Sequence, residues 1–205
     1  MSRSDLRLYG RQTIRERRMH RYFTRQLADY VEYHRDPRNC AMHVIGIVAL
    51  FLAAILPLHL WSFTVLGIIV PAAAFAVAPV LIYWFLLDVA LGSAIACAAA
   101  LLLSAAAAIA DHASIAGMWS ISGVLIAIGV ASQIVGHRVF EGRQPALVDN
   151  PSHLLLGPMF VMAKLLIALG FRHDLAVVMQ KAQSPGLSGA SRFPELTEGG
   201  PRPTL

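Results

Sequence analysis

Residues 44–136 form a long tract that contains no Lys, Arg or Glu, and its acidic side chains are Asp88 and Asp111 alone. The whole chain is 57% hydrophobic and 14% charged, whereas soluble domains hold about half apolar and about a quarter charged residues. A helix of about 20 apolar residues crosses the hydrocarbon core of a bilayer. The tract therefore predicts a membrane protein with several spans.

We expect about four spans, and hence an all-α fold, a multi-span transmembrane helix bundle. The second span contains Pro71 and Pro79, which mark a kink or a split, so the number of spans stays open by one. The third consists largely of Ala, Leu, Gly and Ser, which allow close packing in lipid and predict a position inside the bundle. The expected spans are Val44–Leu60, Ser62–Leu87, Val89–Ala110 and Met118–Gly136.

The N-terminal segment, residues 1–43, holds ten Arg against five Asp and Glu. This placement follows the positive-inside rule, predicts a cytoplasmic N-terminus and does not predict a nucleic-acid partner. Apolar residues recur at three- and four-residue spacing in residues 1–33, which indicates one or two amphipathic helices on the membrane surface or against the bundle. Pro37 predicts a polar loop, His34–Asn39, before the first span.

The C-terminal part begins with a polar stretch from His137 to His153 and continues with an apolar run, Leu154–Phe171. Gly157-Pro158 and Lys164 interrupt this run, and a charge at the bilayer centre costs about 3 kcal/mol. We therefore expect an interfacial or re-entrant helix. Residues 1–182 are expected to form one membrane domain, followed by a disordered tail, residues 183–205, that is rich in Ser, Pro and Gly.

The expected topology brings four of the eight histidines to one face of the membrane. The chain enters at His43 and returns at His137, with His34 and His153 nearby. Neutral imidazole is the commonest metal ligand in proteins, so three such rings can hold a divalent ion. The alternative is that each histidine is an interfacial side chain in contact with headgroups and water.

Glu141 follows His137 by four residues, so on a continuous helix the two side chains share a face. The carboxylate is then a metal ligand, an acceptor that orients the imidazole, or part of a solvated helix end near Arg138 or Arg143. His112 precedes His137 by about 25 residues, which corresponds to more than about 30 Å of helix. The expected topology therefore places His112 on the opposite face.

Two polar blocks flank the apolar tract. The first, from Tyr30 to His43, has the pattern Y-x-x-Y-H-x-x-P-x-N-x-x-x-H, and the second, from Gln133 to Asn150, has Q-x-x-G-H-x-x-F-E-x-x-x-P-A-x-x-D-N. Together they resemble the motifs of the Mpo-type 2-hydroxy fatty acid dioxygenase family. Two blocks at matching places are more specific than either alone, and the resemblance covers about residues 22–171.

The resemblance implies an Fe(II)-dependent oxygenase of fatty acid α-oxidation, which uses O₂ to convert a long-chain 2-hydroxy fatty acid to the acid one carbon shorter. His137, which the resemblance also implies as a metal ligand, and Glu141, from its spacing to His137, are the expected catalytic residues. His112 conflicts with the expected topology, and Lys164 stands where the family is expected to carry an acidic residue. His153 matches no family histidine. The metal ligands that the resemblance implies are His34, His43, His137 and His112.

A guanidinium binds a carboxylate through two hydrogen bonds, so Arg35, Arg138 and Arg143 are candidates to hold the substrate, with lipid headgroups as the alternative partner. Tyr33 is a candidate hydrogen-bond donor to the substrate. The acyl chain is expected to lie between the spans. Candidates to orient the ligands, or else to cap neighbouring helices, are Asn39, Asp149 and Asn150.

Two other classes of function stay open. A non-catalytic lipid-binding or scaffold protein would use the polar blocks as a structural cap. A small transporter needs ionisable groups inside the membrane, for which only Asp88, Asp111 and His112 are available, and the chain shows no inverted repeat. We expect a bacterial inner membrane by default, or the endoplasmic reticulum if the protein is eukaryotic.

Overall fold

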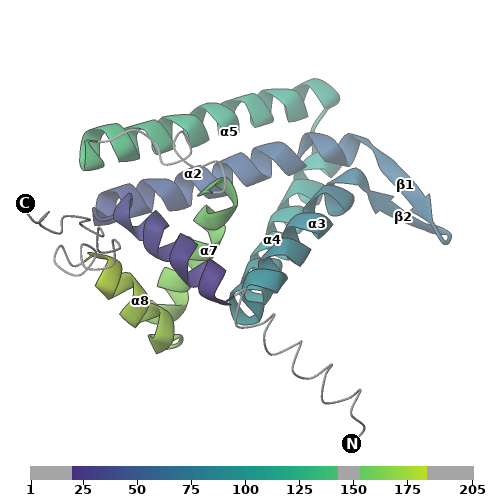
Figure 1. Cartoon of the computed structure of the whole chain (residues 1–205). Coiled ribbons are helices and arrows are strands. Elements are labelled where there is room, and N and C mark those ends of the chain that lie inside the picture. Colours follow the sequence, from purple (N-terminus) through teal and green to yellow (C-terminus); the bar gives the residue numbers. More distant parts are fainter. Residues whose placement is uncertain (1–19, 143–152, 184–205) are drawn as a thin grey trace, which may run out of the picture.

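Three helical segments are long and apolar enough to cross a membrane: Pro37–Leu60, Val89–His112 and Ile115–Glu141. A fourth crossing results if two C-terminal helices, bent sharply against each other, count as one span. The computed structural model, which describes residues 20–142 and 153–183, thus confirms the expected all-α, multi-span bundle (Figure 1). Residues 184–205 of the predicted tail and residues 1–19 of the basic N-terminal segment lie outside the described residues.

Helix α2, Pro37–Ile55, begins inside the stretch that the sequence analysis assigned to a loop. Asp36 is its N-cap and accepts a hydrogen bond from the Arg38 backbone N–H at 2.7 Å. Pro37 occupies the first turn, where its fixed φ suits a helix and its missing N–H leaves no bond unmade. The first span therefore starts at Pro37 and not at Val44, and the 3₁₀ helix η1, Pro57–Leu60, completes it.

The predicted second span is wrong in its first half. Strands β1, Ser62–Val65, and β2, Ile68–Pro71, form an antiparallel hairpin, and helix α3 covers only Ala72–Leu87. Leu66 and Gly67 form the two-residue turn with φ of 52° and 81°, the positive values that a tight hairpin turn requires. The β-branched residues on either side favour strands over helix. Helix α3 is then about 24 Å long, shorter than a bilayer core.

Helices α4, Val89–His112, and α5, Ile115–Val135, agree within a few residues with the third and fourth predicted spans. Asp88 caps α4 by accepting from the Leu91 N–H, and Ser114 caps α5 by accepting from the Gly117 N–H. The expectation that the third span lies inside the bundle is wrong: only 11% of its apolar window is buried, against 39% for the first span. The small side chains of α4 allow close packing, but the neighbouring helices leave most of its surface exposed.

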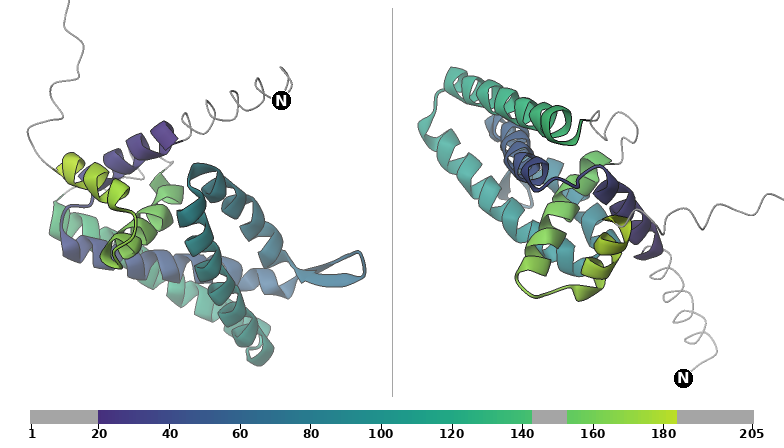
Figure 2. Two further views of the ribbon diagram at one scale, coloured as in Figure 1. Left: turned by 90° about the horizontal axis from the view of Figure 1, so that it is seen from below. Right: turned by 90° about the vertical axis from the view of Figure 1, so that its left-hand side faces the viewer.

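Helix α2 occupies the centre of the bundle and packs along α5, as Figures 1 and 2 show. Glycines allow the two helices to approach closely. A Cβ atom at Gly129 would lie 2.5 Å from Cγ of Leu50, and a Cβ atom at Gly46 would lie 3.0 Å from the carbonyl oxygen of Gly129. Small residues at a crossing let backbones meet in lipid, so this contact places the end of α5 beside the start of α2.

The C-terminal helices α7, His153–Ala168, and α8, His173–Gln183, are bent by 114°. The helix of residues 20–32 packs on them through a shared apolar core, so the basic N-terminal segment packs against the bundle in its described part. The bend agrees with the expected interfacial or re-entrant segment. Lys164 is only partly buried, and its Nζ lies 2.9 Å from Sγ of Cys40 and 5.0 Å from the centre of the Phe160 ring.

Candidate metal centre

Three histidines from separate parts of the chain converge inside the bundle. His34 lies in the turn before α2, His43 lies in α2, and His137 lies in η2, the π-helix Gly136–Glu141 that continues α5. One ring nitrogen from each lies within 4.8 Å of the other two. The three residues are 0%, 4% and 2% exposed. Among the described residues, no other group of His, Cys, Asp and Glu has this spacing.

The backbone around Gly136 determines where His137 points. A π-helix adds one residue to the turn and is frequent at functional sites, because it turns a side chain away from its α-helical direction. Gly136 touches α2 directly, since a Cβ atom there would collide with Oδ1 of Asn39. The absence of a side chain at residue 136 thus lets the π-helix rest on the first turn of α2, one turn before His43.

Hydrogen bonds define the tautomers of two rings. Nδ1 of His34 lies 2.7 Å from the carbonyl oxygen of Tyr30, and Nδ1 of His43 lies 3.1 Å from Oδ1 of Asn39. Amide oxygens only accept hydrogen bonds, so each Nδ1 donates its proton. The Nε2 atoms of the two neutral rings then carry lone pairs, and they face each other at 2.9 Å.

Two lone pairs at that distance repel each other unless a cation binds both. Two imidazole nitrogens bound to one transition metal at a right angle, with metal–nitrogen bonds of about 2.1 Å, lie about 3.0 Å apart. His137 offers a third donor, because its Nδ1 is buried and forms no hydrogen bond to any described residue. The donor set therefore fits a transition metal, and imidazole suits Fe(II), Zn(II) and Cu(II) alike.

Glu141 does not join the three histidines, but it supports them. Its Oε1 accepts hydrogen bonds from the Asp36 backbone N–H at 2.7 Å and from Nδ2 of Asn39 at 3.3 Å. Asn39 also donates to the carbonyl oxygen of Tyr33 at 3.3 Å, while its Oδ1 faces His43. The carboxylate thus holds Asn39 in the orientation that fixes the His43 ring, the behaviour of an outer-shell partner of a metal site.

The surroundings keep His34 neutral. Burial removes water from the ring, and with the neighbouring His43 this lowers the pKa of His34 to about 2. The Tyr30 ring stacks on His34 with a centroid distance of 4.0 Å and an angle of 4° between the planes. A metal ligand must be deprotonated, so His34 is in its binding form at physiological pH.

A cavity of about 140 Å³ adjoins the three histidines. Apolar side chains close one side of it, and a few polar side chains face it from several helices. The residues that line it are Tyr30, His34, His43, Ile47, Leu50, Phe51, Gln133, His137, His153, Leu154 and Gly157.

Residues 20–169 match the model of a protein family described as "2-hydroxy-palmitic acid dioxygenase Mpo1-like". The chain belongs to the Mpo1-like family. A curated relative, the 2-hydroxy-palmitic acid dioxygenase MPO1 of Saccharomyces cerevisiae, is 46% identical over 57 residues, which are 27% of this chain and 33% of the relative. The chain therefore matches about a third of the length of this relative. No solved structure matches the chain.

Several residues that the sequence analysis assigned to the Mpo1-like site lie elsewhere. His112 is exposed at the C-terminal end of α4 and is not in the histidine group. Arg35 and Arg138 are exposed and do not line the cavity. Tyr33 is half-buried and contacts His153 at 5.8 Å between ring centroids, but it does not line the cavity either. The assigned residues outside the described part of the chain are Arg143, Asp149 and Asn150.

Two residues that were not predicted as site residues, His153 and Tyr30, line the cavity beside the three histidines. His153 is 4% exposed, lines the cavity and meets the Tyr30 ring at 5.3 Å between centroids. The position of His153 results from the packing of α7 against the helix of residues 20–32. The spacing of residues along the sequence does not predict this packing. Tyr30 carries a signal that was available: it precedes His34 by one helical turn, the spacing at which a backbone carbonyl meets a ring.

Proposed function

We propose that this Mpo1-like protein is a dioxygenase that converts a long-chain 2-hydroxy fatty acid to the acid one carbon shorter, with Fe(II) bound by His34, His43 and His137. The supporting observation is the face-to-face Nε2 pair of His34 and His43, buried beside His137. The description of the family and the name of the yeast relative support the class of reaction and substrate.

Fe(II) at this position would supply open coordination sites for O₂ and for the carboxylate and 2-hydroxyl oxygens of the substrate. The chain itself orients the ligands through the Tyr30 carbonyl oxygen and Asn39, and excludes water with Leu50 and Phe51. Glu141 acts as a positioning residue through Asn39. The conversion balances when the 2-hydroxy acid and O₂ give the shorter acid, CO₂ and water.

We further propose that the N-terminus and the histidine group lie at the cytoplasmic face of the membrane, in a bacterial inner membrane or an endoplasmic reticulum. The ten Arg of residues 1–43 and their absence from residues 44–136 support this orientation. His34 lies just before the first span and His43 in its second turn, so the site then lies near the cytoplasmic leaflet.

The test is anaerobic loading of the detergent-purified protein with Fe(II), exposure to O₂ with a 2-hydroxy C16 acid, and mass spectrometry of the products. We expect the C15 acid from the wild type, none from His137→Ala, and wild-type turnover from His59→Ala, a histidine at the other end of the first span. A folded protein that binds no iron and forms no product would favour a non-catalytic, lipid-binding role.

A further inference from the structure

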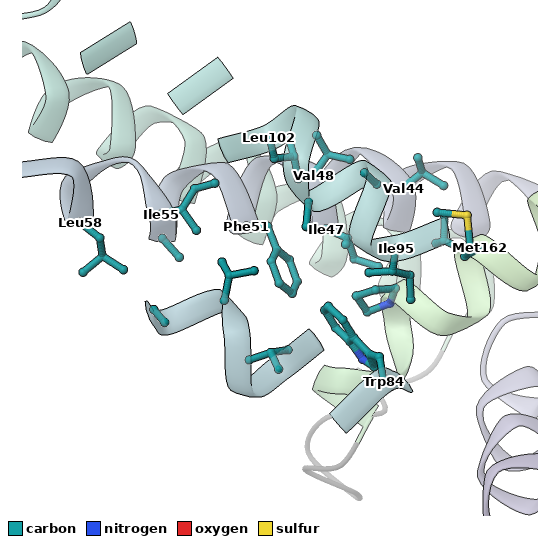
Figure 3. A pocket seen from close by; sticks show the side chains of 18 residues that line it. Val44, Ile47, Val48, Phe51, Ile55, Leu58, Trp84, Ile95, Leu102 and Met162 are labelled. Atoms are coloured by element: carbon teal, nitrogen blue, oxygen red, sulfur yellow. The ribbon is translucent and has the colours of Figure 1, made fainter. Parts of the chain in front are cut away.

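A second, larger cavity of about 290 Å³ lies between α2, α3, α4 and α7 (Figure 3). Its lining is apolar throughout, from Val44 and Met162 at one end to Ile55 and Leu58 at the other, with Phe51 and Trp84 between them. The indole Nε1–H of Trp84 donates to the Leu155 carbonyl oxygen at 2.7 Å. The cavity therefore offers no polar partner to a ligand and suits a hydrocarbon.

This apolar cavity adjoins the cavity beside the histidines. Ile47 and Phe51 line both, so these two side chains form the boundary that the cavities share. The apolar cavity follows one face of the first span from Val44 to Leu58, which at 1.5 Å per residue corresponds to about 20 Å. An extended chain of single bonds advances about 1.2 Å per bond, so this length accommodates about 16 carbon atoms.

We propose that the apolar cavity binds the acyl chain of the substrate, with C1 and C2 beside the histidines and the methyl end near Leu58. This inference rests on the proposed function. Ile47 and Phe51 form the passage between head and chain, and the far end, closed by Ile55 and Leu58, sets the longest chain that fits. Chain-length selectivity thus resides where η1 contacts α3, remote from the metal ligands.

The cavity is open to the bilayer along part of its length. Val44 and Val48 line it and are 41% and 45% exposed, and these side chains face lipid when α2 spans a membrane. A free fatty acid can therefore enter sideways. The cavity beside the histidines measures about 140 Å³, which matches a two-carbon hydroxy acid head but not a glycerophosphate group with two chains. The occupant is a single-chain acid and not a membrane phospholipid.

The test is photocrosslinking in membranes that contain the full-length protein, without added iron. One probe is a 2-hydroxy C16 acid with a diazirine near its methyl end, and a second carries the diazirine near C4. A third, a diazirine-bearing phosphatidylcholine, reports ordinary lipid contact. We expect the methyl-end probe to label residues 54–58 and 72–80, the C4 probe to label residues 44–51, and excess unlabelled 2-hydroxy C16 acid to abolish both signals.

A matched pair of variants on α4 tests the shape of the cavity. Ala98 lines it and is half-buried, whereas Ala100 is exposed and does not line it. We expect Ala98→Phe to reduce labelling by the methyl-end C16 probe at least tenfold while labelling by a C8 analogue stays within twofold. Ala100→Phe should leave both unchanged. Equal effects of the two variants would overturn the proposal, because only one of them fills the cavity.

Two further results would overturn it. One is labelling by the acid probes that unlabelled acid does not displace, and the other is stronger labelling of the cavity by the phosphatidylcholine probe. The readout requires neither metal nor turnover. Displaceable labelling without product formation would therefore refute the proposed reaction alone, while product formation without cavity labelling would refute the acyl-chain cavity alone.

Discussion

The Nε2 atoms of His34 and His43 face each other at 2.9 Å, while the Nδ1 atom of each ring points at an oxygen of the chain's own backbone or of Asn39. Neither ring can turn without breaking its Nδ1 hydrogen bond in a buried place, where an unmade bond costs about 1–3 kcal/mol. The two donors are thus oriented before a metal binds, so little ordering remains to oppose binding.

The ligand set predicts how metal affinity responds to histidine substitutions. We expect His43→Ala to weaken binding of Co(II), a stable stand-in for Fe(II), by more than about 100-fold, because loss of an outer partner alone costs 10–100-fold. His112→Ala should stay within twofold of the wild type, since His112 is exposed outside the group. Calorimetric titration measures both affinities, and a comparable loss in the two variants would contradict the assignment.

The contact between Glu141 and Asn39 predicts an effect on the metal without direct coordination. Glu141→Ala removes the acceptor of the Asp36 N–H and of Asn39 Nδ2, so we expect metal affinity to fall about 10–100-fold. Glu141→Gln keeps an amide oxygen at that place and should restore most of the affinity. If Gln binds as weakly as Ala, the carboxylate charge matters more than the hydrogen bonds. The Co(II) absorption spectrum of each loaded variant reports whether the ligand geometry is retained.

Gly136 offers a test of the contact between the π-helix and α2. A Cβ atom there collides with Oδ1 of Asn39, so Gly136→Ala must displace Asn39 from His43. We expect a destabilisation of about 1–3 kcal/mol and weaker metal binding. Gly123→Ala, at a site in α5 where a Cβ atom meets nothing within 4 Å, should show neither effect. Unfolding in mixed micelles and metal titration separate the two quantities, and an unaltered Gly136→Ala protein would disprove the close contact.

Arg172 ties the bend between α7 and α8 to the start of α4. Its guanidinium donates to Asp88 at 2.7 Å and to Asp174 at 2.8 Å, with 10% and 55% of the two acidic side chains exposed. We expect Asp88→Asn, which keeps the α4 cap, to lower the free energy of unfolding by about 1–2 kcal/mol. Asp174→Asn, at the exposed partner, should cost less than about 1 kcal/mol. Urea unfolding in micelles compares them, and the reverse order would show that Asp174 holds the bend.

Local sequence patterns predicted the membrane spans well where the apolar composition of a segment alone determines that it forms a span. The apolar tract located α4 and α5 within a few residues, because crossing a bilayer requires a long apolar helix whatever its neighbours are. The same reasoning failed at residues 62–71, where hydropathy does not separate a hairpin from a helix. The β-branched residues around Leu66-Gly67 were the available signal, and the proline-based interpretation as a kink overlooked them.

Some residues of the candidate site could likewise be predicted from the sequence, and others could not. His34, His43 and His137 were predicted from topology and motif, and the structure brings them together. The residues that contact these histidines were harder to predict from the sequence. The role of Glu141 was left open between ligand and partner, and its bond to Asn39 joins residues 102 positions apart. His153 was set aside, although it lines the same cavity.

The amino-acid sequence by itself determined that this chain has helices able to span a membrane and that His34, His43 and His137 lie at one end of them, because hydrophobicity and charge act locally along the chain. Only the tertiary structure decided which nitrogens face each other and which helix occupies the centre. It also decided that an apolar cavity along α2 shares two lining side chains with the cavity beside the histidines. The first two features depend on close packing at Gly46, Gly129 and Gly136, and packing joins residues whose separation in sequence carries no periodic signal.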